Sequence, residues 1–158
     1  MAVTIRRARK EDGRRVAELA VKLARQHEAY DALRFARLYD ESNAEPYYGS
    51  RNETGDEAVL VAQLDSEIVG FAYVQYEAVN YLGLLKNFAW LHDIYVEESA
   101  RGTGAGKSLM DAAIEVAKEF GADKLVLSVA AKNEHARGFF EHGGFRTTMF
   151  EMTLNLIS

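Results

Sequence analysis

The sequence predicts a single α/β domain in which a mixed β-sheet carries helices on both faces. The chain has 158 residues, the length of one ordinary domain, with no repeat, linker or low-complexity tract. Runs with strand-like character are interleaved with segments whose apolar residues recur at helical spacing. Glycine, proline and polar residues separate these runs. We therefore assign residues 1–158 to one domain with helices packed on a sheet.

The N-terminal third is expected to form a strand, one long helix and a second short one. A strand over about residues 3–8 precedes a helix whose N-cap is expected to be Asp12. Apolar residues lie on one face of this helix over 16–23. Residues 33–38 fit a second short helix, and Pro46, the only proline, is expected in a loop.

The middle of the chain is expected to contain a hairpin and a central strand. Residues 58–62 and 67–77 pair around a turn at Asp65-Ser66. A long, rather apolar connection follows over 78–88. It leads to a central strand at about 89–96.

The C-terminal third is expected to alternate helix and strand. Apolar residues at helical spacing over 109–120 end at Gly121, a residue type that commonly ends helices. A strand at 124–129, a helix at 134–142 and a final alternating strand at 149–156 complete the prediction.

The segment 101–108, with sequence RGTGAGKS, is the strongest functional signal. It lies between the central strand and a helix, and its alternating glycines let the backbone turn tightly and leave its N–H groups uncovered. The helix start adds unpaired N–H donors and a positive dipole end, and Arg101 and Lys107 add charge. This chemistry suits a phosphate or pyrophosphate.

Two common nucleotide loops fit the segment poorly. A Walker A loop requires glycine where the chain has Arg101. The dinucleotide fingerprint requires G-x-G-x-x-G, whereas this spacing is G-x-G-x-G. A glycine-rich turn without a ligand stays open as the simplest alternative.

A second motif favours one family. Residues 133–145 match N-x-x-A-x-x-F-[YF]-x-x-x-G-F at every fixed position, and R-x-x-G-x-G begins at Arg101. Both motifs resemble those of the GNAT superfamily of acetyl-CoA-dependent N-acetyltransferases and occur in the family's order. The resemblance extends from about residue 3 to 155, is weakest between 25 and 55, and has some likeness to the diamine N-acetyltransferase branch.

This resemblance implies a fold, a reaction and a co-substrate. The sheet would be strongly twisted, have about six to seven strands and splay between the fourth and fifth strands. The chain would transfer an acetyl group from acetyl-CoA, without a metal, to a primary amine of a small molecule or peptide. The implied acetyl-CoA contacts are Ile94, Tyr95, Val96, Arg101, Gly102, Thr103, Gly104, Ala105, Gly106, Lys107, Asn133 and Phe140. Asn133 equally fits the N-cap of the last helix.

Catalysis requires a proton acceptor, because an amine with a pKa of about 10.4 is almost fully protonated at neutral pH. His92 and Asp93 on the central strand are the candidates, and the family's diamine branch carries a glutamate at the position of His92. A hydrogen-bonded strand histidine without a catalytic role stays open. The chain has no cysteine, so direct attack in a ternary complex is expected.

The general acid is left unassigned by the sequence. Many members of the family carry a tyrosine where this chain has Phe140, which donates no proton. Tyr73, Tyr76, Tyr95 or water are the alternatives. A non-catalytic acyl-CoA-binding sensor or regulatory domain therefore stays open as a second function.

The expected partners follow from charge and from the family. The net charge of −5 disfavours a general nucleic-acid binder and favours a cationic amine, for which Glu28, Tyr30 and Asp31 are the candidate contacts. His135 and His142 lack a third ligand for a metal. No apolar run is long enough for a membrane span. We expect a cytoplasmic protein without membrane or nucleic-acid partners, and a homodimer is the assembly considered.

Overall fold

The computed structural model describes residues 2–52 and 54–157 and divides into two compact units, treated separately below. The larger unit comprises the chain up to Leu23 together with Tyr39–Leu127. The smaller unit comprises Ala24–Leu38 and the chain from Ser128 onward.

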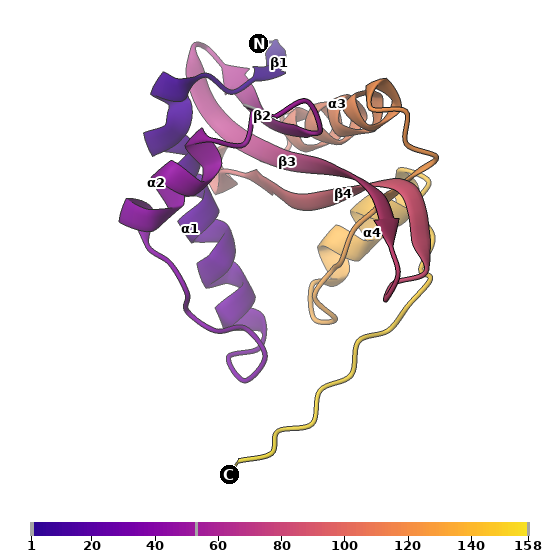
Figure 1. Ribbon diagram of the computed structural model, residues 1–158. Helices are drawn as coiled ribbons and strands as arrows, with labels where there is room; N and C mark the ends of the chain where they lie inside the picture. Colours follow the sequence, from indigo (N-terminus) through magenta and orange to yellow (C-terminus); the bar gives the residue numbers. More distant parts are fainter. Residues whose placement is uncertain (1, 53, 158) are drawn as a thin grey trace. The chain divides into compact units, whose positions relative to one another are not determined.

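The larger unit is built on one five-stranded sheet (Figure 1). Its strands lie side by side in chain order, β1 to β4 antiparallel and β5 parallel to β4. They are β1 (Val3–Arg7), β2 (Glu57–Leu64), β3 (Glu67–Asn80), β4 (Leu85–Val96) and β5 (Lys124–Val126). The mixed α/β architecture is confirmed, but the described residues form five strands and not the expected six to seven.

The final predicted strand is the main reason for the difference. Residues 149–156 form no strand in the described chain, and their apolar side chains are exposed, Met152 to 91%. Alternating apolar residues indicate which faces a strand would have, but a strand forms only where a neighbour supplies hydrogen-bond partners.

The described residues form four α-helices. They are α1 (Gly13–Tyr30), α2 (Glu41–Gly49), α3 (Ala105–Glu119) and α4 (Glu134–His142). The motif helix at 134–142 is confirmed with the same bounds, and α3 ends as expected before Gly121, whose φ is +82°. The amides of Gly121 and Ala122 bond back to Lys118 and Ala117, as in a glycine-ended helix.

Three predictions about the N-terminal helices were wrong. Residues 33–38 form a turn and irregular chain, and the short helix is α2, in which Pro46 lies. Asp40 starts α2 by accepting from the amides of Ser42 and Asn43, a cap that outweighs one proline in a two-turn helix. Asp12 does not cap α1 but closes a 3-10 turn, accepting from the Arg9 amide at 2.6 Å.

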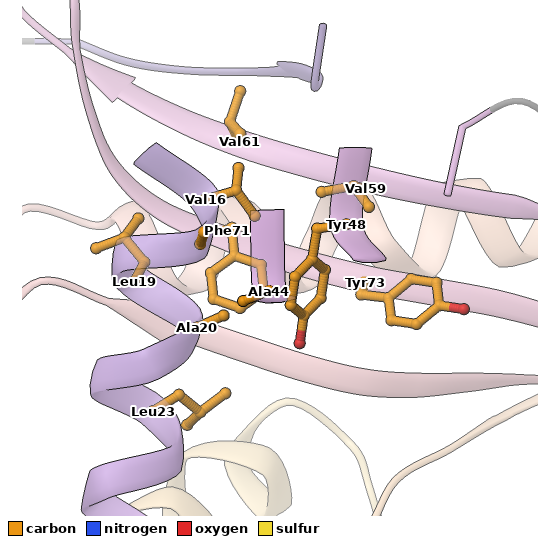
Figure 2. Close-up of a cluster of buried hydrophobic side chains, with 11 residues drawn as sticks. Val16, Leu19, Ala20, Leu23, Ala44, Tyr48, Val59, Val61, Phe71 and Tyr73 are labelled. Carbon is orange, nitrogen blue, oxygen red and sulfur yellow. The ribbon is translucent and has the colours of Figure 1, made fainter. Parts of the chain in front are cut away.

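The sheet of the larger unit separates two apolar layers. On one face, Val59, Val61, Phe71 and Tyr73 pack against α1 and α2 (Figure 2). On the other face α3 packs closely, because a Cβ at Gly70 would lie 3.1 Å from Leu109 and 2.8 Å from the Tyr95 carbonyl oxygen. Helices on both faces are therefore confirmed within this unit.

The hairpins also differ in part from the expectation. The turn at Asp65-Ser66 is confirmed, with φ of +51° and +71°, the left-handed pair that two-residue hairpin turns require. The segment 78–88, expected as a connection, continues both strands, since Asn80 pairs with Leu85. The connection between the two strands is therefore only the four-residue turn Tyr81–Leu84.

Candidate active site on the central strand

The central feature of β4 is an extra residue opposite β3. Asp93 pairs with Tyr73 and Leu91 pairs with Val74, so His92 has no residue of β3 opposite it. Such a β-bulge interrupts the alternation of side chains. As a result His92 and Asp93, consecutive in sequence, both contact residues on the face that carries Tyr73 and α2.

His92 lies in an aromatic and amide environment. Its ring is 5.1 Å from the Tyr73 ring and 5.9 Å from the Trp90 ring, nearly parallel to the latter. Its Nε2 atom is 2.8 Å from Oε1 of Gln75. Burial lowers the pKa of His92, and the nearby carboxylates of Glu57 and Glu77 only partly oppose this effect. The imidazole is therefore favoured in its neutral form, which can accept a proton.

Asp93 receives a hydrogen bond from α2. The Tyr48 hydroxyl donates to Oδ2 of Asp93 at 2.8 Å, and Tyr48 is 5% exposed. Burial, together with the Asp93 charge, raises the pKa of Tyr48, so its proton stays on the phenol. One oxygen of Asp93 is thus occupied, which makes this carboxylate less free than His92 to take a proton.

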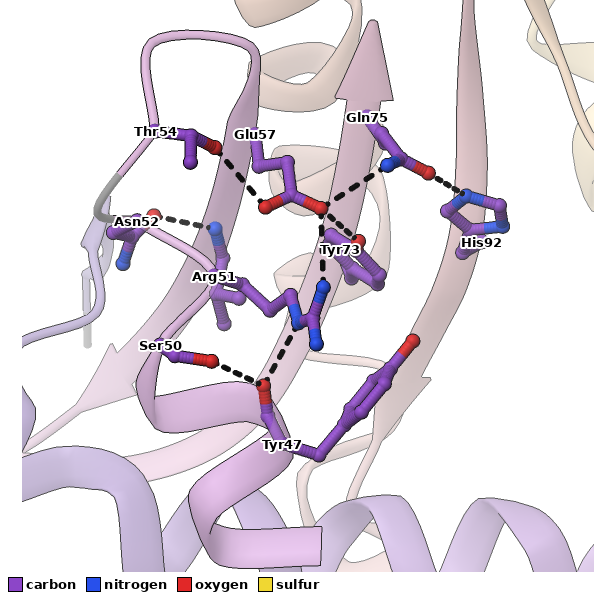
Figure 3. A network of polar contacts seen from close by, with 10 residues as sticks. Tyr47, Ser50, Arg51, Asn52, Thr54, Glu57, Tyr73, Gln75 and His92 are labelled. Carbon is purple, nitrogen blue, oxygen red and sulfur yellow. Dashed lines mark hydrogen bonds and ion pairs between the residues drawn. The ribbon is translucent and has the colours of Figure 1, made fainter.

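Behind His92 lies a buried carboxylate, Glu57, at the start of β2 (Figure 3). Its Oε1 atom accepts from the Tyr73 hydroxyl at 2.6 Å, from Nε2 of Gln75 at 3.1 Å and from Arg51 at 3.4 Å. Thr54 donates to Oε2 at 3.1 Å. Four donors compensate the burial of the charge, as a buried carboxylate requires.

The far edge of β4 is open beyond the bulge. β5 pairs with β4 only at Phe88–Trp90, and in the described residues no strand continues that ladder along Ile94–Val96. The backbone of this edge can therefore bond an extended ligand. Among the described residues, Arg101 reaches this edge, and its Nε lies 3.4 Å from the Val96 carbonyl oxygen.

The glycine turn follows this edge directly. Gly102 and Gly104 have φ of +82° and +90°, and no atom lies within 4 Å of a Cβ built on either. Thr103 fixes the turn by donating to the Ala100 carbonyl at 2.6 Å. The first intrahelical bond of α3 runs from the Ser108 amide to Gly104, so the amides of Gly106 and Lys107 precede it. The Ala105 amide is bonded to Oγ1 of Thr103, so the N–H groups available at the start of α3 are those of Gly106 and Lys107.

The two basic residues of the turn, Arg101 and Lys107, lie in different surroundings. The guanidinium of Arg101 lies 5.9 Å from the Tyr95 ring centre, against the strand edge. The ammonium of Lys107 pairs with Asp111 at 2.7 Å on the exposed surface of α3. Ala105 is buried beneath the turn, so it contributes its backbone alone.

The smaller unit holds the two remaining expected cofactor residues. Asn133 caps α4, its Oδ1 accepting from the Ala136 amide at 3.1 Å, which confirms the structural alternative for this residue. Phe140 is 7% exposed and packs edge-on against Phe139 and Phe145. Their contacts with a cofactor stay predictions.

The three expected substrate residues also lie in the smaller unit. Glu28 accepts from Arg25 at 3.1 Å and from Arg37 at 2.9 Å, and the Arg37 bond in particular lowers its pKa. Asp31 accepts from the Leu33 amide, and Tyr30 lies 6.3 Å edge-on from His27. Since Glu28 is already neutralised by two guanidinium groups, it offers less to a cationic ligand than its sequence suggested.

Two polar neighbours of the candidate site were missed at the level of sequence. Glu57 and Gln75 come from β2 and β3, and no motif links them to His92. The described residues contain no group of three or more His, Cys, Asp or Glu side chains placed to hold a metal. Nor is any described helix long and apolar enough to cross a membrane.

Comparison with known proteins agrees with this geometry. The model of the acetyltransferase (GNAT) family matches residues 27–145. An uncharacterized N-acetyltransferase of Archaeoglobus fulgidus is 32% identical over 138 residues, 86% of this chain and 88% of the relative. YhfO of Bacillus subtilis, also an uncharacterized N-acetyltransferase, is 30% identical over 113 residues, 70% of this chain and 73% of YhfO.

A solved structure shares the fold at lower identity. AAC(6')-Iy in complex with a CoA-containing bisubstrate analogue superposes with a TM-score of 0.80 at 16% identity, covering 100% of both chains. The matched span of 27–145 contains the bulged strand, the glycine turn and the motif helix. The chain therefore belongs to the GNAT family of acetyltransferases and is an acyltransferase.

Proposed function

We propose that this protein moves an acetyl group from acetyl-CoA to a primary amine of a small molecule or peptide, by direct attack in a ternary complex. The observation that carries the proposal is the bulge in β4. It sets His92 and Asp93 on one face of a strand whose open edge leads straight into the glycine turn.

Acetyl-CoA would use the open edge and the turn in sequence. The pantetheine arm would pair with the backbone of Ile94–Val96 as an added strand does. The pyrophosphate would lie over residues 102–106, held by N–H groups and the start of α3. Asn133 and Phe140 belong to the same proposal as further contacts. AAC(6')-Iy, with the same fold, is known in complex with CoA, which supports this assignment.

The acceptor amine must lose a proton before or during attack. His92 is proposed as the general base, since its lowered pKa keeps it neutral near pH 7. The amine nitrogen then bonds to the thioester carbonyl carbon, the carbon–sulfur bond breaks, and the thiolate takes up a proton. The products are an N-acetyl amine and CoA. Asp93 is the second candidate for the base.

Tyr95 is proposed as the proton donor to the leaving thiolate. Among the tyrosines considered, Tyr73 already donates to Glu57 and Tyr76 donates to Asn87 at 2.8 Å. Tyr95 lies two residues after Asp93 in β4 and beside Arg101, and no hydrogen bond of its hydroxyl is found among the described residues. Its ring packs against the core, but of the three hydroxyls it is the one without a hydrogen bond in the described part of the fold.

The acceptor is proposed to be cationic. The net charge of −5 favours cations, and the bisubstrate analogue bound by AAC(6')-Iy carries neamine, an amine-rich sugar derivative. Tyr30 and Asp31 remain the proposed contacts, with Glu28 secondary because Arg25 and Arg37 occupy it. A homodimer also stays a proposal, and the molar mass by analytical ultracentrifugation tests it.

The deciding experiment is an acetyl-CoA assay against a panel of amines that reads the release of free thiol. Polyamines, aminoglycosides, amino sugars, lysine derivatives and peptide N-termini form the panel. Varying both substrates should give intersecting lines in double-reciprocal plots. Tight CoA binding without thiol release for any amine would favour the sensor alternative, and parallel lines with an acetylated protein residue would contradict direct attack.

A further inference from the structure

The hydrogen bonds that link Glu57, Gln75 and His92 determine where the hydrogen atoms of Gln75 and His92 lie. As a carboxylate, Glu57 can only accept hydrogen bonds. The group of Gln75 that lies 3.1 Å from it must therefore be the amide NH2. This turns the other end of the amide, the oxygen Oε1, toward His92 (Figure 3). The orientation of Gln75 follows from the chemistry of its neighbour.

The orientation of Gln75 determines which nitrogen of His92 carries hydrogen. An amide oxygen accepts and does not donate, so Nε2 of His92, 2.8 Å away, must be the donor. In a neutral imidazole with hydrogen on Nε2, the lone pair lies on Nδ1.

We infer that Gln75, held by Glu57, fixes His92 as the Nε2–H tautomer, so that Nδ1 is the atom that takes the proton from the acceptor amine. Gln75 and Glu57 are then positioning residues, because they act through His92. The tautomer of His92 and the orientation of Gln75 follow from the contacts alone. The transfer of the amine proton to Nδ1 rests in addition on the proposed function.

The neighbours of Glu57 make the arrangement rigid. Tyr73, Arg51 and Gln75 converge on one oxygen, and Thr54 donates to the other, so the carboxylate has little freedom to rotate. When His92 gains a proton, Nε2–H continues to donate to Gln75. The charge of Glu57, relayed by the polarised amide, then favours the imidazolium.

Nitrogen-15 NMR of histidine-labelled protein tests the tautomer without any assay of activity, since the two nitrogens of a neutral imidazole resonate differently. The His92 signal is assigned by its absence in His92→Gln. We expect the Nε2–H tautomer in the wild type, and a wild-type Nδ1–H tautomer would overturn the inference.

Gln75→Lys inverts the hydrogen bond. Its ammonium can pair with Glu57 but can only donate to His92, so Nε2 must become the acceptor and hydrogen must move to Nδ1. An unchanged Nε2–H tautomer in folded Gln75→Lys would overturn the inference. Glu77→Gln is the matched control: Glu77 acts on His92 through its charge and through the Trp90 ring that it holds, but makes no hydrogen bond to the imidazole, so the His92 tautomer in this variant should equal the wild type's.

Gln75→Met, of similar length but unable to hydrogen-bond, connects the tautomer to catalysis. We expect kcat to fall about tenfold, a part of the 10²–10⁴-fold that a general base contributes, with KM for acetyl-CoA unchanged. Equal kcat in Gln75→Met and the wild type, with His92→Ala impaired, would overturn the positioning role and leave the proposed function intact. If the tautomer inverts in Gln75→Lys but His92→Ala stays fully active, the orientation of Gln75 and the tautomer of His92 are supported. The role of His92 as general base is then contradicted.

Discussion

The two ends of β4 show how one strand serves structure and chemistry. Its first half is paired on both sides, with β3 and with β5 at Phe88–Trp90. Its second half, beyond the bulge, is paired with β3 alone and carries His92 and Asp93. Phe88 is fully buried, whereas His92 keeps an exposed surface although its imidazole is partly desolvated by its neighbours. The comparison indicates that the strand is enclosed where it packs in the core, and that the proposed ligand-binding groups lie where it is paired on one side alone.

Replacing Phe88, in the enclosed first half of β4, should mainly lower the stability of the fold. Phe88→Ala removes a fully buried ring and should lower the free energy of unfolding by about 3–5 kcal/mol, measured by urea denaturation. His92→Ala, at the open end, should cost less than about 1 kcal/mol. Equal losses in the two variants would contradict the division of the strand.

Replacing His92 should reveal the chemical half. His92→Ala is expected to lower kcat/KM by about 10²-fold, the usual scale for one acid–base group, and the loss should shrink at high pH where the amine is already free. Initial rates across pH measure this. An unchanged pH profile in His92→Ala, with Asp93→Ala inactive but folded, would move the base to Asp93.

The glycine turn should respond to charge more than to backbone strain. Gly104→Glu places a carboxylate where the pyrophosphate is proposed, and CoA affinity by calorimetry should fall at least about tenfold. Gly104→Ala is the control, because it shares the unfavourable φ of +90° and meets no atom within 4 Å. If Gly104→Glu and Gly104→Ala bind CoA equally, charge repulsion at the turn is not the cause of any loss of affinity.

The pH dependence should follow His92. Activity should rise with pH as the imidazole of His92 loses its proton. Because the pKa of His92 is lowered, this acidic limb of the pH–rate profile should lie below about 6.5, the ordinary pKa of histidine. The folded chain binds fewer protons there than the unfolded chain, so the stability from this group is complete above that pH and is lost as pH falls. Glu57→Gln removes a charge that favours the imidazolium, and the limb should move to lower pH. A limb at unchanged or higher pH would contradict this account.

The smallest effect is expected at the general acid. Phe140→Tyr should retain full activity, because the fold already functions without a phenol at that position. Tyr95→Phe should lower kcat several-fold, and Phe140→Tyr in the same chain should restore part of that loss if the phenols are interchangeable. Full activity in Tyr95→Phe would assign the proton to water.

Local signals predicted much of the fold and the turn. The Asp65-Ser66 hairpin, the glycine-ended α3 and the bounds of α4 depend on a few neighbouring residues, and these predictions were confirmed. The family was also recognised correctly from two motifs. Each of these signals lies within one short stretch of chain.

Features that depend on distant pairing were not predicted. Nothing in the sequence around His92 shows that β3 skips it, because the bulge exists only in the register between two strands. The same holds for Glu57, which precedes β3 by several residues and meets His92 only through Gln75. Alternation alone failed at 149–156, where the described residues supply no strand partner.

The bulge has a consequence for building hybrids of this protein with its relatives. Before it, even-numbered residues such as Trp90 share a face with Gln75, and after it odd-numbered residues such as Asp93 and Tyr95 share that face with Tyr73 and Phe71. One inserted residue thus changes the parity of the whole strand end. Deleting His92 would remove the bulge, yet Asp93 and Tyr95 would stay opposite Tyr73 and Phe71, because the remaining residues then pair in regular alternation. A transplanted segment that lacks this one residue can therefore fit the sheet and still lack the position of the proposed base.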